Sequence, residues 1–245
     1  MIPIQKLHYN LEKVSMGLVV AIIVAASIGG IVEIAPLFTI KETVKVPDDL
    51  RPVTPLELAG RQIYIREGCY ACHSQMIRSL SDEIDRYGPY SLAAESAYDH
   101  PMLWGSKRTG PDLARVGGKY SDAWHVKHLI NPRHVVPASI MPVYPWLMET
   151  LDTRLLSAEV STLHRLGVPY DTSQIDNVDK DVLAQSQPDS ADAKGVSKRY
   201  GKDVAIRAFD GDPERLTEMD ALVAYLQSLG TRTKEPYKIL SERPK

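Results

Sequence analysis

Two cysteines and a histidine make residues 68–75 the stretch of the sequence best suited to chemistry. It reads GCYACHSQ, so that Cys69 and Cys72 lie three positions apart and His73 follows directly. The chain of 245 residues contains no other cysteine. Thiols at this spacing can close a disulfide, bind a zinc ion together with two further ligands, or attach a haem covalently.

The three alternatives make different demands on the rest of the sequence. A redox-active C-x-x-C pair is expected beside a strand–helix–strand unit, and no such pattern is visible. Zinc would need two further ligands, for which His125 and His128 are the closely spaced pair, and it would leave His73 without a role. A haem uses all three residues of the motif, because each thiol adds to one vinyl group and the adjoining imidazole binds the iron. We therefore predict one covalently bound haem c on Cys69, Cys72 and His73.

The ligand on the opposite side of the iron decides between electron transfer and ligand binding. Three methionines could occupy that position: Met102, Met141 and Met148. Met141 has the most suitable context, since three prolines in residues 137–145 keep the surrounding SIMPVYPW loop extended. An open position would favour a haem-based gas sensor, whereas a His73–Met141 pair favours one-electron transfer.

Residues 107–111 are predicted to position the haem without binding its iron. The carbonyl of Pro111 can accept the Nδ1–H of His73 and so orient the imidazole. Arg108 can donate to a haem propionate, because planar cationic donors suit a carboxylate. The alternatives are an ordinary turn at Pro111 and a plain surface charge at Arg108.

Helix signals around these residues predict an all-α domain. A capping box, TPLE at residues 54–57, opens a helix that Gly68 ends just before the cysteines. Further helices are predicted over three ranges that end at a glycine or at Asn-Pro: residues 121–130, 152–166 and 217–229. Met219 lies on the apolar face of the last helix, and no strand pattern is apparent.

The N-terminal run from Val14 to Val32 contains 19 residues without a charge. As a helix it would be about 28 Å long, close to the apolar thickness of a bilayer. A cleaved signal peptide would have a shorter apolar region followed by a small-residue cleavage site, which IVEIAPLF lacks. One face of the run carries small residues every four positions, a pattern suited to close packing against another membrane helix: Gly17, Ala21, Ala25 and Gly29.

These features divide the chain into five predicted parts. They are a cytoplasmic N-terminus (1–13), a membrane anchor (14–34), a proline-containing linker (35–53), a periplasmic haem domain (54–230) and a loose charged tail (231–245). Within the domain, residues 170–215 are polar and rich in aspartate, and we expect a surface insertion there. The orientation follows from the haem motif, because bacteria attach haem covalently on the outer side of the inner, cytoplasmic membrane.

Composition argues against two other classes of protein. A formal net charge of −2 and the lack of a basic run give no reason to expect a nucleic-acid partner. Two cysteines are too few for a disulfide-rich scaffold, whereas 44% hydrophobic residues permit a packed core.

Four long strings carry a resemblance to a known family. They are GCYACHSQMIR, RYGPYSLAAESAYDHPMLWGSKRTGPDLARVGGKYSD, HLINPRHVVPASIMPVYPWL and EMDALVAYLQSLG. Together with the anchor they resemble the membrane-anchored mono-haem cytochrome c subunit, subunit II, of bacterial cbb3-type cytochrome c oxidases. The resemblance covers nearly the whole chain except the region near 170–210.

The resemblance implies a class I cytochrome c-like fold with axial ligands His73 and Met141. It also implies a helix crossing built from Gly60, Tyr64 and Tyr225. The subunit would pass electrons to a haem–copper catalytic subunit that reduces oxygen, beside a di-haem cytochrome c subunit, and would not be the oxygen-reducing centre itself. A soluble cytochrome c is a candidate donor, and a stand-alone anchored electron carrier is the alternative.

Overall fold

The computed structural model describes residues 8–9, 12–37, 46–105 and 107–241. The chain divides into two compact units, residues 1–45 and 46–245. Within the described ranges the regular structure is helical, and the only extended pairing is an isolated bridge between Thr150 and Thr217. The all-α prediction is therefore confirmed.

The first unit contains α2, Ser15–Leu37. Its residues Ser15–Pro36 have a mean hydropathy of 2.5 and none of the apolar window is buried inside the chain. Among the described residues this is the one helix long and apolar enough to cross a membrane. The helix runs three residues past the predicted end of the anchor, into the proline-containing segment.

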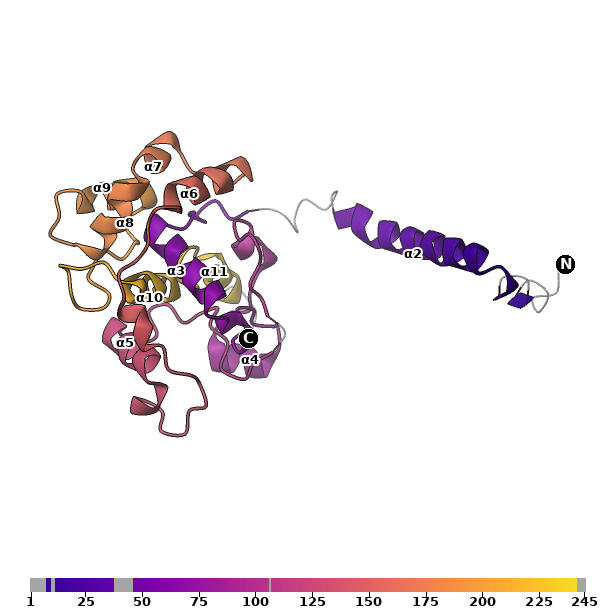
Figure 1. Cartoon of the computed structure of the whole chain (residues 1–245), viewed down its shortest axis with the longest axis horizontal. Helices are drawn as coiled ribbons and strands as arrows, with labels where there is room; N and C mark the ends of the chain where they lie inside the picture. Colours follow the sequence, from indigo (N-terminus) through magenta and orange to yellow (C-terminus); the bar gives the residue numbers. More distant parts are fainter. Residues whose placement is uncertain (1–7, 10–11, 38–45, 106, 242–245) are drawn as a thin grey trace. The chain divides into compact units, whose positions relative to one another are not determined.

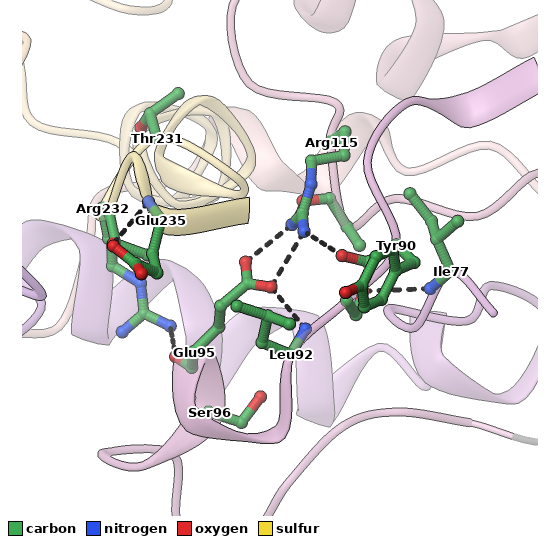
Figure 2. Close-up of polar contacts among 12 residues, drawn as sticks. Ile77, Tyr90, Leu92, Glu95, Ser96, Arg115, Thr231, Arg232 and Glu235 are labelled. Atoms are coloured by element: carbon green, nitrogen blue, oxygen red, sulfur yellow. Dashed lines mark hydrogen bonds and ion pairs between the residues drawn. The ribbon is translucent and has the colours of Figure 1, made fainter. Parts of the chain in front are cut away.

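Two capped helices, α3 (Pro55–Arg66) and α10 (Glu218–Ser228), cross at the centre of the second unit (Figure 1). Each begins with a capping box, formed by Thr54 and Glu57 in α3 and by Thr217 and Asp220 in α10. Both helices bury most of their residues, so that their contact forms the middle of the apolar core.

The crossing depends on a glycine. A Cβ added at Gly60 would lie 1.9 Å from the carbonyl oxygen of Ala221, so that the two backbones approach more closely than any side chain allows. Beside this contact the rings of Tyr64 and Tyr225 pack edge to face, with centroids 5.5 Å apart. The structure thus brings together the three residues that the resemblance assigned to the crossing.

Shorter elements surround the crossing. On the way from the cysteine motif to the last helix they are η1 (Cys69–Ala71), α4 (Ser81–Tyr87), η2 (Ala93–Ser96), α5 (Asp122–Ile130), η3 (Pro132–His134), η4 (Pro145–Met148) and α6 (Leu156–Arg165). The predicted start of α6 at residue 152 is four residues too early. Asp152 accepts hydrogen bonds from the backbone N–H and guanidinium of Arg154, and this local turn competes with helix.

The region 170–215 was expected at the surface and proves to contribute to the core. It folds as α7 (Thr172–Asp176), α8 (Val178–Ser186) and α9 (Ala193–Tyr200), which gather with α6 on one side of the domain (Figure 1). Val178, Val182, Val196 and Tyr200 are buried, and α8 packs against α3 and α6. Few apolar residues suffice because most of them face inward, although Leu183 of α8 is exposed. Buried Asp181 is paired with Arg199.

The last segment is also more ordered than a loose tail. It forms α11, Glu235–Ser241, after Thr233, which is buried and donates to Asp49 Oδ1 at 2.6 Å. Lys234 N–H donates to the other oxygen of Asp49 at 2.9 Å. These bonds join the C-terminal segment to the beginning of the second unit.

Candidate haem site

The cysteine motif occupies one tight turn after α3. Gly68 adopts φ +69°, a left-handed conformation that ends the helix, and η1 follows at once. The backbone N–H groups of Cys72 and His73 both donate to the carbonyl oxygen of Cys69, at 3.1 and 2.9 Å. Both cysteines are free thiols; Cys72 is exposed, and burial raises the pKa of Cys69 to about 12. Two thiols and an imidazole therefore leave the same turn.

His73 is oriented by the loop at residues 110–113. Its Nδ1 donates to the carbonyl oxygen of Pro111 at 2.8 Å, which leaves Nε2 as the nitrogen available to a metal. The two segments are also paired through their backbones, since Gly110 N–H donates to the Cys72 carbonyl and Leu113 N–H to that of Ser74.

Gly110 is a site residue that the sequence analysis missed. A Cβ at this position would lie 2.3 Å from Cε1 of His73, so that only glycine lets the backbone pack against the imidazole. Asp112 was also missed. Its carboxylate accepts from Ser74 Oγ at 2.6 Å and from Met76 N–H at 2.9 Å, and fastens the loop to the motif. The pair Gly110-Pro111 could have indicated this loop, but the sequence did not show that Gly110 packs against the ring of His73.

Arg108 lies on the same loop and contacts protein groups. Its Nε donates to Ser74 Oγ at 2.7 Å, and its Nη2 donates to the Met76 carbonyl at 2.7 Å and to Glu83 at 2.8 Å. This pairing with Arg108 holds the pKa of Glu83 at about 2, below its ordinary 4.5. These contacts account for the position of Arg108, and its contact with a propionate stays a prediction.

Met141 lies in an extended loop that is fastened to α5. Its backbone N–H donates to Ser139 Oγ at 3.2 Å, and Tyr144 N–H donates to the carbonyl of Leu129 at 2.9 Å. The side chain of Met141 is half-buried against the core. Of the other methionines weighed, Met102 is half exposed, whereas Met219 is fully buried in the core as expected.

The family model for "Cytochrome C oxidase, mono-heme subunit/FixO" matches residues 8–233. The chain belongs to this family. No curated relative matches it. The helical domain is accordingly a cytochrome c-like fold, and the protein is a mono-haem subunit of a cytochrome c oxidase.

The residues of this cytochrome c oxidase subunit fit a haem. Side chains from four segments present half-buried apolar surface beside the core, as the rim of a large apolar cofactor requires: Cys69, Leu113, Val126, Ile130, Met141 and Tyr144. Cys69 and Cys72 also lie close enough to Tyr144 to raise the pKa of its phenol, after the larger effect of burial. The cysteine turn and the Met141 loop therefore border the same part of the molecule.

Zinc fits less well. Among the described residues no group of three or more His, Cys, Asp or Glu side chains is placed to hold a metal ion. The four residues weighed for zinc, Cys69, Cys72, His125 and His128, are all described, and they do not converge. The donor set present, one oriented imidazole with two thiols in its own turn, is the one a haem requires.

Proposed function

We propose that this oxidase subunit is a one-electron relay that carries a single covalently bound haem c. The observation that supports the proposal best is the 2.8 Å hydrogen bond from His73 Nδ1 to Pro111, made in the same turn that presents two free thiols. A relay needs an imidazole held in one orientation, and this bond provides it.

Each residue of the site has a defined part in the proposal. Cys69 and Cys72 would hold the haem by thioether bonds, and His73 and Met141 would bind its iron. Pro111 orients His73, and Arg108 is proposed beside a propionate. When bound, the haem supplies a reversible one-electron change at its iron, and a methionine ligand raises its reduction potential. With His73 and Met141 both bound, the chain would keep oxygen from the iron.

The proposed relay also implies a location for the chain and a set of partner subunits. Residues 14–34 anchor the chain in the bacterial inner membrane, with residues 1–13 cytoplasmic and the haem domain of residues 54–230 periplasmic. The proposed acceptor is the haem–copper catalytic subunit of a cbb3-type oxidase, which reduces oxygen to water in aerobic or microaerobic respiration. A di-haem cytochrome c subunit is the proposed neighbour, and a soluble cytochrome c is a candidate donor.

Co-purification with the catalytic subunit tests the relay directly. The tagged chain, solubilised from its native membrane in mild detergent, is expected to bring b-type haem and copper with it. When the reduced complex is mixed with oxygen, the haem c of this chain should be oxidised within one turnover, and its c-type absorption band should change accordingly. If the chain instead purifies alone and fully haem-loaded, it is a stand-alone anchored carrier.

A further inference from the structure

Two histidines of α5 have buried ring nitrogens that make no hydrogen bond to any residue that the structure describes. They are Nε2 of His125 and Nδ1 of His128. His125 is only 3% exposed. A buried imidazole nitrogen without a partner is costly, and in native proteins such atoms usually meet a protein group, water or a ligand.

These rings are on one face of α5, because residues three apart on a helix are neighbours. Their orientation is set by Trp124, which stacks on His128 with centroids 4.7 Å apart and meets His125 edge-on at 5.3 Å. Tyr120 stacks on the other side of Trp124 at 4.0 Å. Aromatic packing therefore holds both imidazoles in place independently of any hydrogen bond.

The same helix borders the candidate haem site. His128 lies close enough to His73 for the charge of His73 to lower the pKa of His128, in addition to the larger effect of burial. Leu129 binds the Met141 loop through Tyr144 N–H, and Val126 and Ile130 belong to the half-buried apolar set that includes Cys69 and Met141.

We propose that His125 and His128 donate hydrogen bonds to the propionate carboxylates of the haem, and so act as positioning residues. The inference rests on the haem assignment made under the proposed function. A haem presents two anionic carboxylates, and N–H donors are the groups that satisfy them. The proposal requires His125 as the Nε2–H tautomer and His128 as the Nδ1–H tautomer.

The charges around α5 suit neutral donors. Burial lowers the pKa of His125 to about 4, so that its ring is uncharged at neutral pH, and burial also lowers the pKa of His128. The acid nearest to His125 on its own helix is Asp122, which is bound by Arg207 and by Gln227 of α10. Arg108, which is proposed above to lie beside a propionate, also donates to Ser74, Met76 and Glu83, so that the two histidines would add donors to it rather than replace it.

Substitution of each histidine in the full-length, detergent-solubilised holo-protein tests the proposal. His125→Leu and His128→Leu remove the donor, whereas His125→Asn and His128→Asn keep an amide N–H. We expect the leucine variants to lower the reduction potential, because an unbonded carboxylate stabilises the oxidised iron, and to shift the propionate bending mode in resonance Raman spectra. The asparagine variants should recover part of both changes. His164→Gln, an exposed histidine on α6, is the control and should leave both unchanged.

Nitrogen-15 spectra of the reduced, unsubstituted protein decide the matter even if a leucine variant fails to fold. Two slowly exchanging imidazole N–H protons are expected, in the tautomers stated above, with cross-relaxation to the propionate methylenes. Rapid exchange or the opposite tautomers would overturn the proposal, as would a parental potential and Raman mode in both leucine variants. The haem assignment itself fails separately, if the parent protein lacks covalently attached haem.

Discussion

At the scale of single residues, the imidazole of His73 is confined from two directions. Pro111 accepts its Nδ1–H at 2.8 Å, and Gly110 lies where a Cβ would be 2.3 Å from its Cε1 atom. Orientation and close packing thus come from two adjacent residues of one loop. This loop is in turn held by Asp112, which bonds to Ser74 and Met76 of the motif.

The first prediction concerns Gly110. Gly110→Ala should displace the His73 ring, because the new methyl group would overlap it, and should reduce the fraction of protein that carries covalent haem. The fraction is measured from the reduced pyridine haemochrome spectrum relative to total protein. Thr109→Ala in the same loop is the control, and an unchanged haem content in Gly110→Ala would contradict the close packing.

The second prediction concerns Met141. Met141→Ala should abolish the weak iron–sulfur absorption band at the near-infrared edge of the oxidised spectrum and lower the reduction potential, because the thioether ligand is lost. Carbon monoxide should then bind to the reduced variant rapidly. Met102→Ala, which changes a half-exposed methionine, should behave like the parent protein. If the band survives in Met141→Ala, a residue other than Met141 is the sixth ligand.

The third prediction concerns the acid stability that Glu83 provides. Its folded-state pKa of about 2 lies below its ordinary 4.5, so between these values the unfolded chain binds a proton that the folded protein does not. The contribution of Glu83 to stability is therefore complete above about pH 4.5 and is lost as the pH falls towards about 2. Glu83→Gln should lower the free energy of unfolding at neutral pH, and the difference from the parent should shrink across this window.

Denaturant unfolding of the solubilised protein at a series of pH values measures this difference. Asp82→Asn removes an exposed carboxylate from the preceding position of α4 and serves as the control for net charge. If the difference between parent and Glu83→Gln stays constant from neutral pH to about 2, the ion pair with Arg108 is not the source of the stability.

At the scale of elements, the domain depends on the crossing of α3 and α10. Gly60 permits the backbones to touch, and the buried rings of Tyr64 and Tyr225 pack beside them. The C-terminus of α3 then leads straight into the cysteine turn, so the crossing also sets where the motif begins. Helix α8, from the region 170–215, also packs on α3. Thr54 Oγ1 at the start of α3 donates a 2.5 Å hydrogen bond to Gln185 of α8.

The fourth prediction belongs to this crossing. Gly60→Ala should lower the free energy of unfolding by about 1–3 kcal/mol, because a methyl group would force the helices apart. In an exposed helix the same change would be favourable by about 1 kcal/mol. Thermal unfolding followed by far-ultraviolet circular dichroism measures the effect. Gln62→Ala, on the exposed side of α3, should change stability by less than about 0.5 kcal/mol.

At the scale of the whole molecule, the chain joins an apolar helix to a compact helical domain. Among the described residues, none covers the apolar window of α2, and a Cβ added at Gly29 would have no neighbour within 4 Å. Lipid or other oxidase subunits are the expected cover for this helix, because its length and composition suit a membrane. The small residues at every fourth position give one of its faces the shape that close helix packing requires.

The fifth prediction tests that face. Ala25→Leu should reduce the amount of catalytic subunit that co-purifies with the chain, because the larger side chain separates helices that pack through small residues. Ala26→Leu makes the same change about 100° further round the helix and should leave the complex intact. Equal recovery of the complex with both variants would show that the small-residue face does not mediate assembly.

Some properties of this protein are determined by the sequence alone, because they depend on neighbouring residues. The C-x-x-C-H motif specifies one turn, and capping boxes begin α3 and α10 where the sequence predicts them. The apolar run of α2 needs no partner within the chain to be recognised. A capping box joins residues three positions apart, and an apolar run is a property of composition. Both are local, so they can be recognised in the sequence before the fold is known.

Other properties are decided only by the tertiary structure, because they join residues far apart in the chain. The partners of Arg108 lie on other segments, and Gly110 meets a ring 37 positions earlier. The region 170–215 looked like surface because its apolar residues are few, and only the packing of α8 on α3 shows that most of them face inward. Likewise, only the folded structure shows that His125 Nε2 and His128 Nδ1 are buried without a hydrogen bond to the described residues. Long-range packing selects among contacts that local sequence leaves equally open.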